Sequence, residues 1–191
     1  MNIYILCGHP FRNSFCGHLT DLYEQRALAS GHNVRVQFLG ELKFDPILHM
    51  GYKDIQALEP DLLQAQENIL WCNHWVIIYP VWWGSVPALL KGFLDRTLHP
   101  GFAFKYRENS PWWDKYLKGR SAELIATSDA PGFWLNWIYR ASDFRTLKTA
   151  TLEFCGIKPV KTHRLDRVKH KSIGILVKEA EKKILSKIKK V

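Results

Sequence analysis

The stretch HWVIIYPVWWGSVPALLKGFLDRTLHPGFAF at residues 74–104 decides the fold of this chain. Residues 74–80 are nearly all apolar and rich in β-branched and aromatic types, which is typical of a strand that is covered on both faces of a parallel sheet. Open α/β sheets bind ligands beyond the carboxyl ends of their strands, so the next loop is a candidate site. That loop consists of Val81, Trp82, Trp83, Gly84 and Ser85. Its two tryptophans suit a flat ligand, although they would equally fill a core or an interface.

The start of the chain predicts the other half of such a site. Residues 2–7, NIYILC, form a short apolar strand, and the following loop ends at Ser14, a good N-cap for a helix. Free backbone N–H groups after an N-cap bind phosphate with the help of the helix dipole. Phe15, Cys16 and Gly17 would supply these groups, and His9 and Arg12 could add charge or hydrogen bonds. Because capping is the ordinary use of serine, a purely structural role of Ser14 is the alternative.

Strands and helices alternate along the rest of the chain. This alternation predicts an α/β fold with a parallel five-stranded sheet wound on both faces, in the order 2-1-3-4-5. In that order the loops after strands one and three lie side by side. The expected strands are residues 2–7, 33–38, 74–80, 121–128 and 159–165; the expected helices are 14–29, 59–71, 86–98, 135–155 and 171–189, with 40–58 and 99–120 irregular.

Three motifs together carry a family resemblance. The patterns HPFRNSF at 9–15, PVWWGSVPALLKGFLDR at 80–96 and GFAF at 101–104 resemble the flavodoxin-like NAD(P)H:quinone oxidoreductases over about two-thirds of the chain. This family includes quinone reductases, modulators of drug activity and the ancillary flavoproteins of potassium efflux systems. The resemblance implies a flavodoxin-like, three-layer fold and a bound flavin. The residues implied to bind it are His9, Ser14, Phe15 and Cys16 at the phosphate, and Pro80, Val81, Trp82, Trp83 and Gly84 at the isoalloxazine ring.

A third part of the implied flavin site departs from the family. The family follows its fourth strand with a Thr-Thr-Gly-Gly turn, where this chain has Thr127, Ser128, Asp129 and Ala130. Losing two glycines removes conformational freedom from a turn close to the ligand, which puts tight flavin binding in doubt. The carboxylate of Asp129 could accept a hydrogen bond from the flavin, or oppose the negative charge of the reduced flavin. The alternative is that Asp129 points to solvent and caps the next helix.

The motifs assign no catalytic side chain. Some family members place a tyrosine and a histidine after this turn, whereas residues 133–139 read FWLNWIY and the next histidine is His163. The spacing of Tyr139 is wrong for that role, and its helical period with Leu135 is more typical of a core residue. Because the flavin itself carries the hydride chemistry, the protein supplies mainly orientation and electrostatics.

Length and cysteine content agree with a cytoplasmic protein. The chain has 191 residues, of which 47% are hydrophobic, and this predicts a single domain over residues 1–191. No apolar run reaches the roughly 18 residues that span a bilayer, and the chain enters a strand directly. The four cysteines lack metal or disulfide spacing, so we expect buried reduced thiols and no metal. A reactive Cys16 at a helix start is the alternative. The cysteines are Cys7, Cys16, Cys72 and Cys155.

The net charge of +9 comes entirely from the end of the chain. Residues 1–157 carry 15 basic and 15 acidic side chains, and residues 158–191 carry 12 basic and three acidic ones. This pattern predicts a docked amphipathic helix with a solvated lysine face. Peripheral contact with an acidic membrane surface or a transporter is an alternative. We expect no nucleic-acid partner, since no binding motif is present.

Together these features predict an FMN-containing NAD(P)H oxidoreductase that reduces quinones or similar acceptors. FMN is preferred to FAD because the chain is short. The resemblance also implies a homodimer, with Trp112 and Trp113 as interface candidates in an aromatic segment. The alternative function is a regulatory subunit of a potassium-efflux transporter with weak or lost reductase activity.

Overall fold

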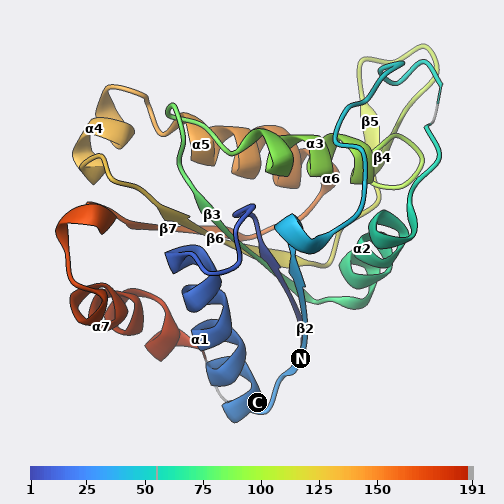
Figure 1. The fold of residues 1–191 in the computed structure, drawn as a ribbon. Coiled ribbons are helices and arrows are strands. Elements are labelled where there is room, and N and C mark those ends of the chain that lie inside the picture. The colour runs from blue at the N-terminus through green and yellow to red at the C-terminus, as the bar shows by residue number, and fades with distance from the viewer. Residues whose placement is uncertain (55, 189–191) are drawn as a thin grey trace.

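A computed structural model describes residues 1–54 and 56–188 of the chain. Its centre is a five-stranded parallel sheet in the order β2-β1-β3-β6-β7 (Figure 1). This is the order 2-1-3-4-5 predicted from the sequence, and the flavodoxin-like prediction is confirmed. The strands are β1 (Asn2–Cys7), β2 (Asn33–Phe38), β3 (His74–Pro80), β6 (Ser121–Thr127) and β7 (Val160–Leu165).

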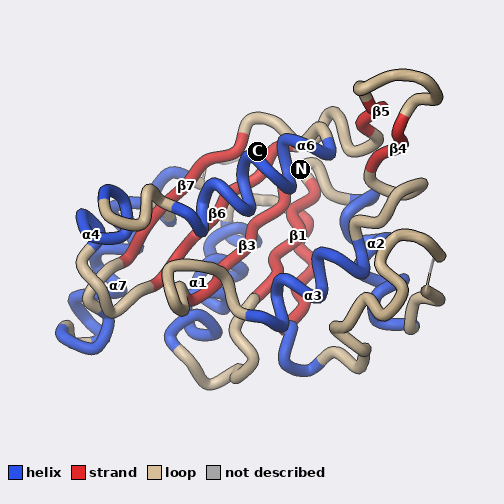
Figure 2. Tube along the Cα trace, turned by 90° about the horizontal axis from the view of Figure 1, so that it is seen from above, coloured by secondary structure: helices blue, strands red, loops and turns tan. Residues whose placement is uncertain are grey.

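Helices cover both faces of the sheet and complete three layers (Figures 1 and 2). One face carries α1 (Phe15–Ala29) and α7 (Ile173–Lys183), and the other carries α2 (Pro60–Trp71), α3 (Ala88–Thr97) and the helical residues 142–155. The helical residues 142–155 comprise α5 (Ser142–Phe144), η2 (Arg145–Leu152) and α6 (Glu153–Cys155). The chain also forms short 3-10 helices, which are η1 (Leu39–Glu41), η3 (Val168–His170) and η4 (Leu185–Lys187).

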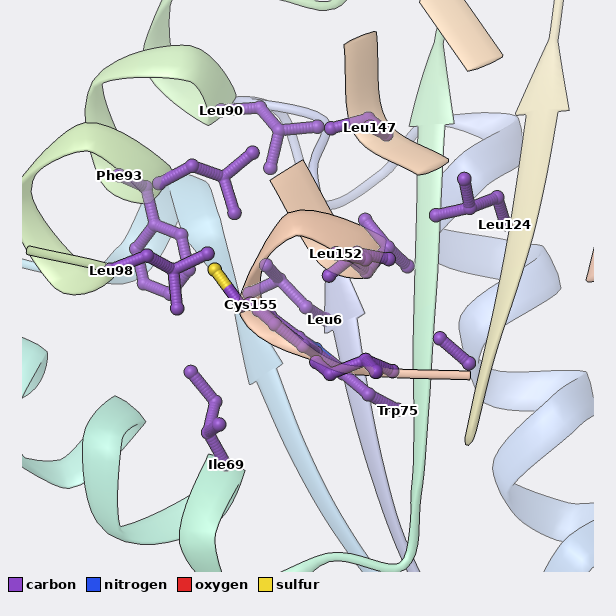
Figure 3. Close-up of a cluster of buried hydrophobic side chains, with 14 of the residues drawn as sticks. Leu6, Ile69, Trp75, Leu90, Phe93, Leu98, Leu124, Leu147, Leu152 and Cys155 are labelled. Carbon is purple, nitrogen blue, oxygen red and sulfur yellow. The ribbon is translucent and has the colours of Figure 1, made fainter. Parts of the chain in front are cut away.

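The alternation of strand side chains builds a core on each face. Tyr4 and Leu6 of β1 face the α2/α3 layer, whereas Ile3 and Ile5 face the α1/α7 layer. Trp75 of β3 is fully buried, and its ring stacks on Tyr4 at a centroid distance of 5.7 Å. Figure 3 shows the α2/α3 core, in which strand side chains meet leucines and Phe93 from the covering helices.

The predicted helix 135–155 is wrong, because the chain forms two helical pieces there. α4 (Gly132–Trp137) ends early, and Arg140 and Ala141 adopt left-handed backbone with φ of 52° and 48°. The following helix then runs from Ser142 to Cys155, with residues 145–152 wound as π-helix. The break allows buried Asp143 to reach polar partners on the sheet, so tertiary contacts override the local helical pattern.

Two other predictions also need correction. The predicted helix 171–189 is shorter, since α7 ends at Lys183 and is followed by η4; residue 189 lies outside the described residues. The segment 99–120, expected to be irregular, contains an antiparallel hairpin of β4 (Phe104–Tyr106) and β5 (Trp113–Lys115) that projects from the sheet (Figure 1). Within the described residues, no helix is both long and apolar enough to cross a bilayer.

The two tryptophans proposed as interface residues differ in their surroundings. Trp113 stacks on Phe154 at 4.3 Å and donates its indole N–H to the Phe154 carbonyl at 2.9 Å, so it anchors the hairpin within its own chain. Trp112 is 65% exposed. Only Trp112 therefore keeps its ring available to a partner.

Candidate functional site

The carboxyl ends of three neighbouring strands bring three loops together. The N–H of Gly8, after β1, donates to the carbonyl of Ile78 in β3 at 2.7 Å. The N–H of Val81, after β3, donates to the carbonyl of Thr127 in β6 at 2.8 Å. The loops predicted to form one site thus lie side by side at the point where the strand order reverses.

His9 and Trp82 join the first two of these loops. Their rings meet edge to face with centroids 5.6 Å apart. The Nδ1 atom of His9 accepts the backbone N–H of Phe11 at 2.9 Å, which leaves the ring hydrogen of a neutral imidazole on Nε2. Partial burial lowers the pKa of His9, so the ring is neutral near pH 7 and Nε2 is a hydrogen-bond donor.

The start of α1 has the geometry of an anion site. The Oγ atom of Ser14 accepts the N–H of Gly17 at 3.2 Å, so the capping role of this serine is confirmed. The N–H groups of Phe15 and Cys16 lack an intrahelical acceptor and lie at the positive end of the helix dipole. A hollow of about 360 Å³ adjoins this helix start; it is lined by Arg12, Asn13, Ser14, Phe15, His18, Asp21 and Ile173.

Two glycines let the first loop approach its neighbours closely. A Cβ atom on Gly17 would lie 1.8 Å from the carbonyl oxygen of Arg12, and one on Gly40 would lie 1.8 Å from that of Pro10. The guanidinium of Arg12 also lies over the ring of Phe38, 3.6 Å from its centroid. These contacts restrict the conformation of the loop.

Cys16 connects the start of α1 to the end of β6. Its Sγ atom lies 3.2 Å from the hydroxyl of Thr127, and its side chain is buried. Burial raises the pKa of Cys16 to about 12. All four cysteines are free and buried, as predicted, and the burial of Cys16 argues against the alternative of a reactive thiol.

We expect Cys16 to resist alkylation in the folded protein. Little of the thiol would be ionised at pH 8, because burial raises the pKa of Cys16 to about 12, and the buried sulfur is hard for the reagent to reach. Iodoacetamide labelling followed by peptide mass spectrometry should find Cys16 unmodified in native buffer and fully modified in guanidinium chloride. Equal labelling rates in both conditions would contradict the burial argument.

The turn after β3 has an unusual backbone. Trp82 and Ser85 exchange two backbone hydrogen bonds of 3.0 and 2.9 Å, and the residues between them, Trp83 and Gly84, have φ of 52° and 71°. A bulky residue with positive φ is rare and points to a functional constraint. Trp83 is fully exposed and Trp82 is 44% exposed, so the alternative that these rings fill the core is wrong.

The segment around α4 closes over this turn. A Cβ atom on Gly84 would lie 3.2 Å from the ring of Tyr139, and the hydroxyl of Ser142 donates to the Gly84 carbonyl. Tyr139 is 46% exposed, so its interpretation as a core residue is wrong. No feature of the sequence had indicated that these residues contact the aromatic turn.

A buried polar network holds the same segment to the sheet. Asp143 accepts hydrogen bonds from the hydroxyl of Tyr79 in β3 at 3.1 Å and from the guanidinium of Arg164 in β7 at 2.8 Å. The Arg164 guanidinium also lies over the ring of Phe144 at 4.4 Å. This network fixes Ser142, and through it the turn that carries Trp83, to two strands.

The turn after β6 does not need the missing glycines. Neither Asp129 nor Ala130 has a positive φ, so the chain adopts this turn with ordinary side chains. The carboxylate of Asp129 accepts the backbone N–H of Lys169 at 3.1 Å and lies 2.9 Å from its ammonium. The expected conformational penalty is therefore absent, and the charge of Asp129 is balanced by a cation of the same chain.

The helix-capping interpretation of Asp129 is wrong. The carboxylate that accepts the first N–H of α4, from Gly132 at 2.7 Å, belongs to Asp166. Asp166 also pairs with the ammonium of Lys171 at 3.1 Å. Asp166 follows β7 directly, so the cap comes from a neighbouring loop rather than from the residue before the helix.

Comparison with known proteins identifies the family. Residues 1–188 of the chain match the model of a protein family whose description is "flavodoxin-like fold". The chain belongs to this flavodoxin-like fold family. The recognition drawn from the sequence motifs is thus confirmed, and the three loops lie at the edge of the sheet where open α/β folds bind ligands.

Two curated relatives of this flavodoxin-like protein have enzyme names. One, from Haemophilus influenzae, is named an uncharacterized NAD(P)H oxidoreductase and is 36% identical over 111 residues, covering 55% of this chain and 54% of that protein. The other, ribosyldihydronicotinamide dehydrogenase (quinone) of Mus musculus, is 29% identical over 182 residues, covering 82% and 77%. The chain spans about half the length of the first relative.

Solved structures agree with this fold. A protein of Streptococcus mutans superposes with a TM-score of 0.80 at 27% identity and covers 100% of both chains. An FMN-dependent NADH-azoreductase of Bacillus anthracis, solved in complex with FMN, gives a TM-score of 0.76 at 18% identity and covers 98% of this chain and 97% of that chain.

Proposed function

We propose that this flavodoxin-like protein is an FMN-dependent NAD(P)H oxidoreductase that reduces quinones or similar acceptors. The contact between His9 and Trp82 carries the proposal, because it places a helix start suited to an anion beside an aromatic turn, at the edge of the sheet where we propose the flavin crevice. The names of the two relatives support a nicotinamide donor and a quinone acceptor. The choice of FMN is supported by the same fold in the azoreductase that contains it.

The chain offers suitable groups to each part of FMN. The unpaired N–H groups of Phe15 and Cys16, with Nε2 of His9, would hold the phosphate. The backbone and rings of the segment 80–84 would line the isoalloxazine ring, and the turn 127–130 would face its pyrimidine edge. Bound there, FMN would supply the hydride acceptor and donor, and the protein would orient the two substrates in turn.

The charges around the turn after β6 would tolerate a reduced, negatively charged flavin. Asp129 is paired with Lys169, and in the segment that follows β7 the single carboxylate of Asp166 contacts both Arg167 and Lys171. The net charge of the side chains around this turn is therefore not negative, although a carboxylate replaces a glycine of the family turn. No side chain of the crevice is assigned a proton-transfer role.

A second copy of the chain would complete the crevice. Several large apolar side chains are exposed at this edge of the sheet, and such groupings mark interaction surfaces. They are Trp82, Trp83, Phe133, Trp134 and Trp137, with exposed fractions of 44%, 102%, 65%, 44% and 81%. We include a homodimer in the proposal because a two-fold partner would cover these rings and shield the flavin from water.

Absorption spectroscopy tests the proposal. After incubation with FMN and desalting, the purified protein should show the absorption bands of oxidised flavin at about 375 and 450 nm. Anaerobic NADPH or NADH should bleach these bands, and a quinone such as menadione should restore them. A protein that retains neither FMN nor FAD would contradict the proposal and favour the regulatory function.

A matched pair of histidine variants locates the flavin. His9→Ala should weaken FMN binding by roughly tenfold, as expected for one lost hydrogen bond to a charged group. His170→Ala, on the exposed turn η3, should leave FMN affinity unchanged. Equal affinities of the two variants would show that FMN does not use the loop at His9.

A further inference from the structure

A second cavity lies at the opposite end of the strands from the crevice. It has a volume of about 440 Å³ and is bordered by the first residues of the central strands, including Met1, His74 and Ser121. It lies on the α1/α7 face, since Ile3, Tyr23 and Ile184 of that core border it. Among residues 1–54 and 56–188, the chain after α7 continues over this part of the sheet as η4 and Ile188. Its volume is in the range of small-molecule sites.

The floor of the cavity is polar, although the same sheet face is otherwise apolar. The side chain of Glu123 is only 9% exposed and accepts a hydrogen bond from the hydroxyl of Tyr23 at 2.8 Å. Nε2 of His74 lies 3.9 Å from the same carboxylate oxygen, and the other oxygen lies 2.7 Å from Nε2 of His163. His74 also contacts the hydroxyl of Ser121 at 2.8 Å through Nδ1.

Glu123 is ionised in this environment. Burial alone would raise the pKa of Glu123, but the contacts with His163, His74 and Tyr23 outweigh burial and hold the pKa well below its usual range. The described residues contain no group of three histidine, cysteine or acidic side chains arranged to hold a metal ion. The contacts that the structure shows in this cluster are hydrogen bonds and close approaches between its own side chains.

The rim of the cavity carries an excess of positive charge. Lys161 lies opposite Glu123 in the β6–β7 register, and Lys187 approaches from η4. Among the described residues that line the cavity, Glu123 is the single acid, and its carboxylate is held by contacts within the floor. Over residues 1–54 and 56–188, neither lysine forms an ion pair within 4.0 Å.

Apolar side chains complete the lining of the cavity. They belong to Ile3, Ile184, Ile188 and Pro159. A ligand that matches these three kinds of lining has a hydrogen-bonding group, a flat apolar body and an anionic group. An amine would meet the lysines, and a bare phosphate would leave the isoleucine walls uncovered.

We propose that this cavity binds a small hydroxylated aromatic carboxylate, with its carboxylate at Lys161 and Lys187 and its hydroxyl at the floor formed by His74, Ser121 and Glu123. The ring lies between the isoleucine side chains. The site is separate from the flavin crevice, so it does not depend on the proposed reductase activity. A bound ligand links α1, β7 and the C-terminal segment.

Calorimetry with 4-hydroxybenzoate tests this site on the full-length protein in its FMN-loaded form, or without FMN if none is retained. We expect one ligand per chain and at least tenfold weaker binding to the double variant Lys161→Gln/Lys187→Gln. Lys178→Gln/Lys182→Gln, which removes equal charge from exposed positions of α7 outside the cavity, should bind like the unmodified protein.

Two further ligands separate the contributions of rim and floor. The neutral 4-hydroxybenzamide should bind at least tenfold more weakly than 4-hydroxybenzoate, and benzoate, which lacks the hydroxyl, should bind several-fold more weakly. Binding in this cavity should leave the flavin absorption bands unchanged, whereas stacking in the crevice would shift them. No binding, equal binding of the amide, an unaffected rim variant or a shifted flavin band would each overturn the proposal.

Discussion

Asp143→Ala is expected to lower the free energy of unfolding by about 3–5 kcal/mol, the usual result of removing one partner of a buried ion pair. Asp143 is 1% exposed, and the side chain of its partner Arg164 is 7% exposed. Without the carboxylate, the guanidinium stays buried with no counter-charge, and the hydroxyl of Tyr79 loses its acceptor. Urea denaturation measures the change, and the melting midpoint should fall by roughly 10 °C.

The same substitution should loosen the aromatic turn. Ser142, next to Asp143, donates to the Gly84 carbonyl, so FMN retention should fall together with stability. Asp95→Ala is the control, since Asp95 pairs with Lys91 at the surface and should contribute no more than about 1 kcal/mol. If the two alanine variants unfold at the same urea concentration, the buried network does not stabilise the fold as we infer.

Gly17→Ala is expected to abolish tight FMN binding. The new Cβ atom would lie 1.8 Å from the carbonyl oxygen of Arg12, and that oxygen belongs to backbone that cannot move without reshaping the first loop. The N–H groups at the start of α1 and the ring of His9 would shift together. We expect an FMN dissociation constant at least about a hundredfold higher, equivalent to about 2.7 kcal/mol.

Gly174→Ala provides the matched control for this substitution. Gly174 is also an early helical residue, in α7, but a Cβ atom there meets no heavy atom within 4 Å. Alanine should leave FMN binding unchanged and stabilise the helix by about 0.5–1 kcal/mol. Normal FMN binding by Gly17→Ala, measured by fluorescence quenching of the flavin, would show that the first loop is not the phosphate site.

The strand order and the position of the crevice could be predicted from the sequence. A continuous apolar run such as residues 74–80 requires cover on both faces, and alternation with helices then leaves few possible topologies. The N-cap at Ser14 was predictable because its hydrogen bond is local. The backbone conformation of the turn 82–85 could not be predicted, since nothing in the sequence WWGS required a positive φ at Trp83.

The buried carboxylates were missed for a related reason. Glu123 stands in an otherwise apolar strand, which is a signal that it needs partners, but those partners lie in α1, β3 and β7. The partners of Asp143 likewise come from β3 and β7. A single sequence without a fold gives no means of choosing them.

The sequence by itself determined the local features of this protein: the strands, most helix starts and the motifs that identify the family. Only the tertiary structure decided how the chain breaks at Ala141, which residue caps α4, how Asp129 is neutralised and where a second cavity opens. The physical reason is the distance along the sequence over which each kind of interaction acts. Hydrophobic period and capping act over a few residues, whereas a buried charge is stabilised by whichever distant strand or loop the fold places beside it.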